Sequence, residues 1–149
     1  MAYTDTISLW DAKDYLGIDD TSRDAEITRM ISSALKYVEK STNILFDVRD
    51  KIYDLDENSC VYVYDSPINT LDAALDATVT RVNKGTYSIY SDSNIDAETL
   101  TLNVGSITPD EDLLEAAYML IDHFFNEGTR TNIPNAVDDI ININRRFII

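Results

Sequence analysis

The residues best suited to bind a metal form an acidic segment in the middle of the chain. Asp54, Asp56, Asn58 and Asp65 place oxygen ligands at positions one, three, five and twelve of a calcium-loop pattern. Position six carries Ser59 where such loops have glycine, and position twelve carries a shorter acid than the usual glutamate. Because the flanking residues alternate like strands, an acidic surface turn is the better interpretation, and metal binding here stays an open question.

Other catalytic chemistry has little support in the residue types. A single histidine, His123, excludes zinc motifs built on histidine pairs, and its place on an apolar helix favours a structural role. The single cysteine, Cys60, precedes an apolar strand and has no activating neighbours. The sequence contains neither a glycine-rich phosphate loop nor a GxSxG motif. We therefore expect no catalytic residue, assign no metal ligand and no cofactor, and predict that the protein is not an enzyme.

The charge balance restricts the partners. The 149 residues include 12 Lys and Arg against 27 Asp and Glu, which gives a formal net charge of −15 at pH 7. Such a chain repels nucleic-acid phosphates and anionic membrane surfaces, since affinity for both depends on Lys and Arg. No run of 18 apolar residues offers a membrane span, and the segment MAYTDTISLW lacks the features of a signal peptide. We expect no membrane association and a chain that stays where it is made.

The first 42 residues contain the pattern of two helices. Ser8 is placed as an N-cap with Asp11 three residues later, and Gly17 is placed to end a helix over Leu9–Leu16. A longer helix is predicted from about Arg23 to Thr42, because apolar residues recur there at helical spacing.

The last third of the chain also predicts helices. The segment Thr108-Pro109-Asp110-Glu111 has the residue types of a capping box with proline at the first helical position, so a helix should start there and run to about Asn126. Its apolar residues cover more than half of the circumference, which requires cover on two sides, either from the same chain or from a neighbouring subunit. A short helix is predicted from about Asn135 to Arg145.

Between these helical segments the apolar period changes to two, which is the period of strands. Val61 and Val63 face one side of the segment VYVY, while Tyr62 and Tyr64 face the other. Leu100, Leu102 and Val104 alternate with polar residues in the same way. The segment NKGT at 83–86 carries the glycine of a tight turn and predicts a hairpin. The sequence thus predicts a single α+β domain over residues 1–149: a bundle of three to four helices, from about 8–42 and 108–146, with a small antiparallel β-sheet inserted at about 50–104.

In that order, the segments resemble a known family. The N-terminal stretch SLWDAKDYLGIDDTSRDAEITRMISSALKYVEKSTN looks like the opening of the tailed-bacteriophage head-tail connector proteins, also called adaptor or head-completion proteins. The stretch LLEAAYMLIDHFFNEGTRTNIPNAVDDIININRRF resembles the second half of that family, and DSPINTL followed by YSIYSD resembles the branch with a β insert between the helices.

The resemblance implies a structural virion protein in the neck of the particle, synthesised in the host cytoplasm. It would form a cyclic ring of about a dozen copies under the capsid portal, contact the portal protein and a stopper or tail-completion protein, and serve genome packaging and ejection. DNA would pass through the lumen without specific binding, and a wall rich in Asp and Glu favours this because it repels phosphate.

Three sets of residues are candidates for contacts in such a ring. The tail is basic and then apolar, so it is assigned to portal docking, with folding back of Phe147 and Ile149 onto their own core as an equally weighted alternative. The docking residues are Arg145, Arg146, Phe147, Ile148 and Ile149. The candidate subunit-interface residues on the long helix are Tyr118, Ile121 and Phe125. The candidate loop contacts are Arg130, Asn132 and Pro134.

Two hypotheses from other classes stay open. An acidic chain of this size could mimic DNA and occupy the basic cleft of a host nucleic-acid enzyme. A mimic needs its acids on one continuous face, whereas Lys and Arg are scattered along the second helix and the tail, which favours the connector. A small hydrolase that uses carboxylates or calcium is the third hypothesis.

Overall fold

The structure is a computed structural model that describes residues 6–56, 60–65, 67–71, 77–83, 86–91, 99–106, 108–128 and 131–145. The chain divides into two compact units. A helical unit combines Met1–Thr42 with Ile107–Arg145, and a β unit contains Asn43–Ser106. The two ends of the chain therefore build one unit, and the middle builds the other.

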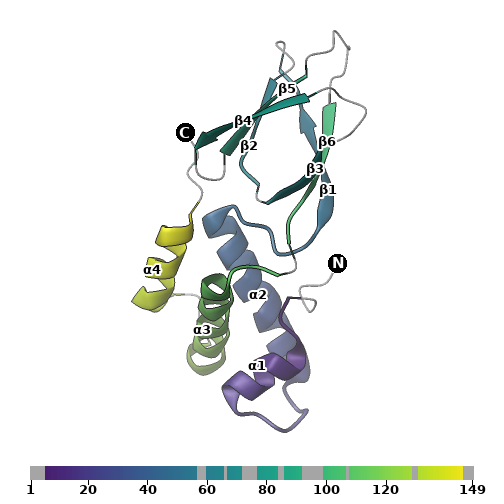
Figure 1. Ribbon diagram of the computed structural model, residues 1–149. Coiled ribbons are helices and arrows are strands. Elements are labelled where there is room, and N and C mark those ends of the chain that lie inside the picture. Colours follow the sequence, from purple (N-terminus) through teal and green to yellow (C-terminus); the bar gives the residue numbers. More distant parts are fainter. Residues whose placement is uncertain are drawn as a thin grey trace. The chain divides into compact units, whose positions relative to one another are not determined.

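Four helices make up the helical unit. They are α1 (Leu9–Leu16), α2 (Asp24–Thr42), α3 (Glu111–Glu127) and α4 (Asn135–Asn144). Helix α3 contacts each of the other three, and α2 lies beside it (Figure 1). Its wide apolar face, with Leu113, Leu120 and Ile121 fully buried or nearly so, is covered largely within the same chain.

Helix α1 follows its local signals closely. The Ser8 hydroxyl accepts a hydrogen bond from the Asp11 backbone N–H at 3.1 Å, which satisfies one of the free donors of the first turn. Gly17 adopts φ +69° at the C-terminal end, and its N–H donates to the Asp14 carbonyl at 3.1 Å. The predicted bounds, N-cap and C-cap of this helix are confirmed.

The predicted start of α3 is wrong. Asp110, and not Thr108, is the residue that precedes the helix, and it keeps an extended ψ of 144° without a side-chain cap bond. Its carbonyl accepts the first helical hydrogen bonds, from the N–H groups of Leu113 at 3.0 Å and Leu114 at 3.2 Å. Because Asp110 is extended, Pro109 cannot be the first helical residue, and the helix begins at Glu111.

The β unit holds two antiparallel three-stranded sheets, with strand orders β1-β6-β3 and β2-β5-β4. The strands are β1 (Arg49–Asp54), β2 (Cys60–Val63), β3 (Ile68–Leu71), β4 (Ala77–Asn83), β5 (Thr86–Ser91) and β6 (Thr99–Val104). The α+β class with antiparallel strands between two helical ends is confirmed, but the strands form two sheets and not one. Pairing of β4 with β5 confirms the hairpin, whose turn residues 84–85 lie outside the described residues.

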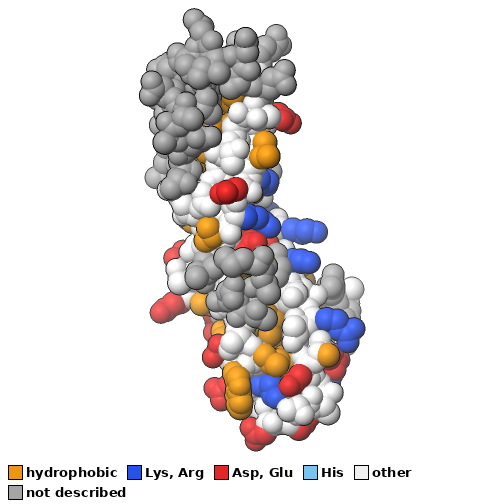
Figure 2. Space-filling model, turned by 90° about the vertical axis from the view of Figure 1, so that its right-hand side faces the viewer, with side chains coloured by type: hydrophobic (Ala, Val, Ile, Leu, Met, Phe, Trp, Pro, Cys, Tyr) orange, Lys and Arg blue, Asp and Glu red, His pale blue; other side chains and the backbone are white. Residues whose placement is uncertain are grey.

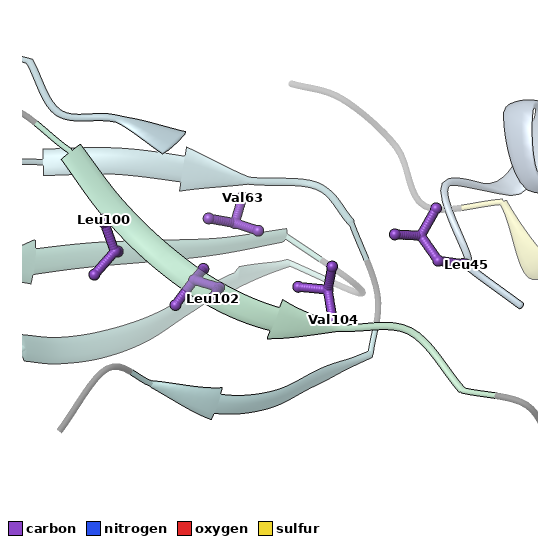
Figure 3. Packing of buried hydrophobic residues seen from close by; sticks show 5 residues of the cluster. All are labelled: Leu45, Val63, Leu100, Leu102 and Val104. Atoms are coloured by element: carbon purple, nitrogen blue, oxygen red, sulfur yellow. The ribbon is translucent and has the colours of Figure 1, made fainter. Parts of the chain in front are cut away.

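The core of the β unit follows the predicted alternation. Leu100, Leu102 and Val104 of β6 are buried on one side of the strand and pack with Val63 of β2 and with Leu45 (Figure 3). Every second residue of β6 points inward, since successive strand side chains face opposite sides.

Backbone contacts tie the two ends of the β unit together. The N–H of Ser106 donates to the carbonyl of Leu45 at 3.0 Å, and the N–H of Gly105 donates to the carbonyl of Pro67 at 2.8 Å. Gly105 has φ +101°, and the carbonyl oxygen of Asp47 lies where a side chain would begin, 1.9 Å from the position of a Cβ. Only glycine fits at this position without a shift of the backbone.

Candidate interaction surfaces

The acidic segment that resembled a calcium loop contains a local hydrogen-bond network. The Asp65 carboxylate accepts hydrogen bonds from Lys51 Nζ at 2.6 Å and from the Tyr53 hydroxyl at 2.5 Å. Burial raises the pKa of Tyr53, and the hydrogen bond to Asp65 raises it further. Asp54 and Asp56 are exposed, and Asn58 lies outside the described residues. Among the residues that the structure describes, no group of three or more His, Cys, Asp or Glu side chains could hold a metal ion.

His123 has a structural contact on α3. Its side chain is buried, and Nε2 lies 2.9 Å from the carbonyl oxygen of Thr131. Because a carbonyl only accepts, Nε2 carries the proton and donates it. The imidazole thus ties the segment after α3 back to the helix, as expected for a structural histidine.

The three α3 residues expected at a subunit interface differ in exposure. The Tyr118 ring stacks on the Tyr15 ring with 5.0 Å between centroids. The Phe125 ring lies under the Arg23 guanidinium, 3.9 Å from its central carbon. Tyr118 and Phe125 are partly exposed, whereas Ile121 is fully buried in the helical unit. Only Tyr118 and Phe125 therefore present surface to a neighbour.

The candidate loop and tail residues are described in part. Asn132 is exposed with φ +54°, and Pro134 directly precedes α4. Arg145 follows the last residue of α4, and its Nε donates to the carbonyl of Ser41 at 2.9 Å. Arg130 and residues 146–149 lie outside the described residues.

Large apolar side chains are exposed on the helical unit. Trp10 on α1 is 78% exposed and Ile143 on α4 is 71% exposed. Sequence reasoning missed Trp10. Its position on the helix could have indicated its exposure. Trp10 lies two residues before the buried Ala12 on a two-turn helix, so it points away from the side of the helix that carries Ala12. Trp10 is a candidate contact residue, because large aromatic side chains are enriched in binding interfaces.

A hollow of about 250 Å³ lies on the same unit. It is lined by Tyr15 of α1, five residues of α3 and the residue before α4. The lining residues are Tyr15, Met119, Asp122, His123, Asn126, Glu127 and Pro134. We call it the α3 hollow.

Charges of both signs occur together on the described surface. Asp and Glu side chains are interspersed with Lys and Arg on the face in Figure 2. In the helical unit, Lys13 Nζ lies 2.8 Å from Asp24 and Arg23 Nε lies 2.6 Å from Glu26. This face is therefore not a continuous acidic one of the kind a DNA mimic needs. In the described part of the chain, no helix is long and apolar enough to cross a membrane.

The architecture is similar to that of solved neck structures. One similar chain belongs to the neck of an empty gene transfer agent (GTA) particle computed with C6 symmetry, with TM-score 0.77 and 14% identity over 100% of this chain and 94% of that one. A second belongs to the neck of a native GTA particle computed with C12 symmetry, with TM-score 0.75 and 12% identity over 100% and 93%. A third, in the virion of the native particle, has TM-score 0.74 and 14% identity over 97% and 91%. No curated protein matches this chain significantly.

The chain thus has the fold of these neck structures. In this chain the fold consists of four helices from the two chain ends and an antiparallel β unit inserted between them. The profile of the phage gp6-like head-tail connector protein family matches residues 6–108. The chain belongs to this family of structural virion proteins, which is not a family of enzymes. The family resemblance seen in the sequence, the connector class and the association with the virion are confirmed.

Proposed function

We propose that the protein forms a cyclic ring of about a dozen copies in the neck of a virion, under the capsid portal, where it connects head and tail. The observation that carries this proposal is the family match over residues 6–108 together with a fold similar over the whole chain to neck proteins. The C6 and C12 symmetries of the similar neck structures support a ring.

The charge of the chain suits a wall that DNA passes. Each copy has a formal net charge of −15, so a ring of many copies is strongly negative. A lumen lined by Asp and Glu then repels the phosphate backbone of DNA. DNA then slides through during packaging and ejection without specific binding.

We assign the contacts in this ring to three groups of residues. Arg145, Arg146, Phe147, Ile148 and Ile149 dock on the portal protein. Tyr118 and Phe125 contact the neighbouring subunit, while Ile121, one turn away on the same helix, supports them from the core. Arg130, Asn132 and Pro134 form loop contacts, and a stopper or tail-completion protein binds on the tail side.

The proposal is tested by the mass of the particle in solution. Light scattering is measured on the purified protein alone and after mixing with portal particles from the same source. A ring-sized mass gain on the portal is expected. A small acidic particle that ignores portals would overturn the proposal, and inhibition of a nuclease by that particle would then establish the DNA mimic instead.

Portal docking is tested by removing residues 145–149. We expect weaker portal binding with an unchanged circular dichroism spectrum, because among the described contacts the helical unit loses two hydrogen bonds of Arg145, from Nε to the Ser41 carbonyl and from the backbone N–H to the Ile141 carbonyl. A folded truncation that binds the portal as well as the full chain would refute the assignment. A large loss of stability would instead show that Phe147 and Ile149 fold back on their own core.

A further inference from the structure

We propose that Trp10 of one copy inserts into the α3 hollow of the next copy in the ring. The inference rests on the proposed ring and deepens it by naming one contact between subunits. It is built from two features of the helical unit, an exposed aromatic side chain and a small hollow.

Trp10 is held at the surface by its own helix. The neighbouring Ala12 and Lys13 are buried, so they fix the orientation of α1 on the bundle. Lys13 Nζ lies 2.8 Å from Asp24 of α2 and 5.9 Å from the centroid of the Trp10 ring. The indole is thus 78% exposed on a short helix that is anchored by a salt bridge. A large aromatic surface in a fixed position is typical of residues that dominate binding at an interface.

The size of the α3 hollow favours a side chain as its occupant. Sites for small molecules and cofactors have volumes of roughly 300–1,000 Å³. The hollow has about 250 Å³, which is below this range. Tyr15 and Met119 are among its lining residues, so part of its surface suits an apolar group.

The polar lining of the hollow is compatible with an indole. Asp122 and Glu127 contribute carboxylates, which accept hydrogen bonds. One Asp122 oxygen, Oδ1, accepts from Asn126 Nδ2 at 2.8 Å, and the carboxylate has further acceptor capacity. Indole is an apolar ring with a single N–H donor and no acceptor, so it matches an aromatic hollow bordered by carboxylates. Ile143, the other strongly exposed apolar residue of the helical unit, offers no donor.

Trp10 and the hollow are different surfaces of the same subunit. Trp10 and the hollow-lining Tyr15 are five residues apart on α1, which turns their directions apart by about 140° and separates them by about 7.5 Å along the axis. Trp10 is not among the residues that line the hollow. A contact between two different surfaces of identical subunits is heterologous, and such a contact closes into a ring when its rotation closes, as in the proposed ring.

The first test uses fluorescence, because Trp10 is the only tryptophan of the chain. Its emission and its quenching by acrylamide are measured together with the mass of the particle, alone and on portal particles. We expect emission of an exposed indole from the monomer, and a blue shift with several-fold weaker quenching when the ring mass appears. A ring in which Trp10 stays exposed would overturn this inference and leave the proposed function standing. Absence of any ring would overturn both.

The second test identifies the occupant of the hollow. In a Cys60→Ser background, Trp10→Cys and Asn126→Cys proteins are mixed and oxidised during assembly. We expect disulfide-linked dimers in the mixture, and none when Ile143→Cys replaces Trp10→Cys. Trp10→Ala should raise the concentration for half-assembly about tenfold or more, and Ile143→Ala should leave it unchanged. Cross-linking of Trp10→Cys to the portal alone, or equal effects of the two alanine variants, would refute the contact.

Discussion

Replacement of Gly105 by alanine should destabilise the β unit strongly. A Cβ at this position would lie 1.9 Å from the Asp47 carbonyl oxygen, 2.8 Å from its carbonyl carbon and 3.3 Å from the Leu45 Cβ. The obstacle is backbone and not the end of a flexible side chain. The hydrogen bonds from the Gly105 N–H to Pro67 and from Asn69 Nδ2 to the Gly105 carbonyl, both 2.8 Å, oppose a shift.

The magnitude follows from two separate costs. A side chain in the positive-φ region costs about 1–3 kcal/mol, and φ is +101° at this residue. Overpacking by an extra carbon costs about 1–3 kcal/mol more. We therefore expect Gly105→Ala to lower the free energy of unfolding by about 2–6 kcal/mol, a large part of the 5–15 kcal/mol of an ordinary domain.

The assay is urea unfolding followed by far-ultraviolet circular dichroism, with Gly17→Ala as the matched control. Gly17 also has positive φ, at +69°, but nothing lies within 4 Å of an added Cβ. The control therefore carries only the conformational cost, about 1–2 kcal/mol. Equal losses in the two variants would refute the argument that the contact with Asp47, and not the backbone angle alone, requires glycine at position 105.

Two further predictions concern charges and protons. Asp24→Asn should lower the free energy of unfolding in urea by about 2–3 kcal/mol, because the Lys13 ammonium, whose side chain is 7% exposed, loses its carboxylate partner. Glu26→Gln removes the carboxylate of an exposed pair and should cost less. A larger loss in Glu26→Gln than in Asp24→Asn would contradict this prediction. The folded protein raises the pKa of Tyr53 above the ordinary value of 10.0. The contribution of the Tyr53 hydroxyl to folding stability is therefore fully present below pH 10.0 and is lost as the pH rises above 10.0. The urea midpoint should therefore fall more between pH 9 and pH 11 in the parent protein than in Tyr53→Phe, and equal falls would show that Tyr53 is not responsible.

The sequence predicted what local chemistry controls. The cap at Ser8 and the end at Gly17 are set by residues a few positions apart, and both occur as expected. The alternation of Leu100, Leu102 and Val104 likewise depends only on neighbours in the chain. Local patterns therefore determined the type and order of most elements.

One error concerned the local conformation of the chain, and the others arose where contacts between distant residues determine the structure. Thr108 and Pro109 have good capping residue types, yet the extended Asp110 sets the start of α3. Pairing of Arg49 with Val104 joins residues more than fifty positions apart, so no short pattern revealed that the strands form two sheets. The exposure of Trp10 depends on which side of α1 meets the bundle, which a two-turn helix specifies weakly.

The backbone bonds at the two ends of the β unit have a consequence for folding. Helices α2 and α3 must pack although residues 43–110 lie between them, and the entropy of closing a loop grows as (3/2)RT ln n. Once β1 and β6 have paired and Ser106 has bonded to Leu45, the free connection shortens to a few residues. By that relation, the pairing lowers the cost of bringing the two helices together by about 2 kcal/mol. A β unit that forms early would thus act as a covalent cross-link does, by restricting the unfolded helices before they pack.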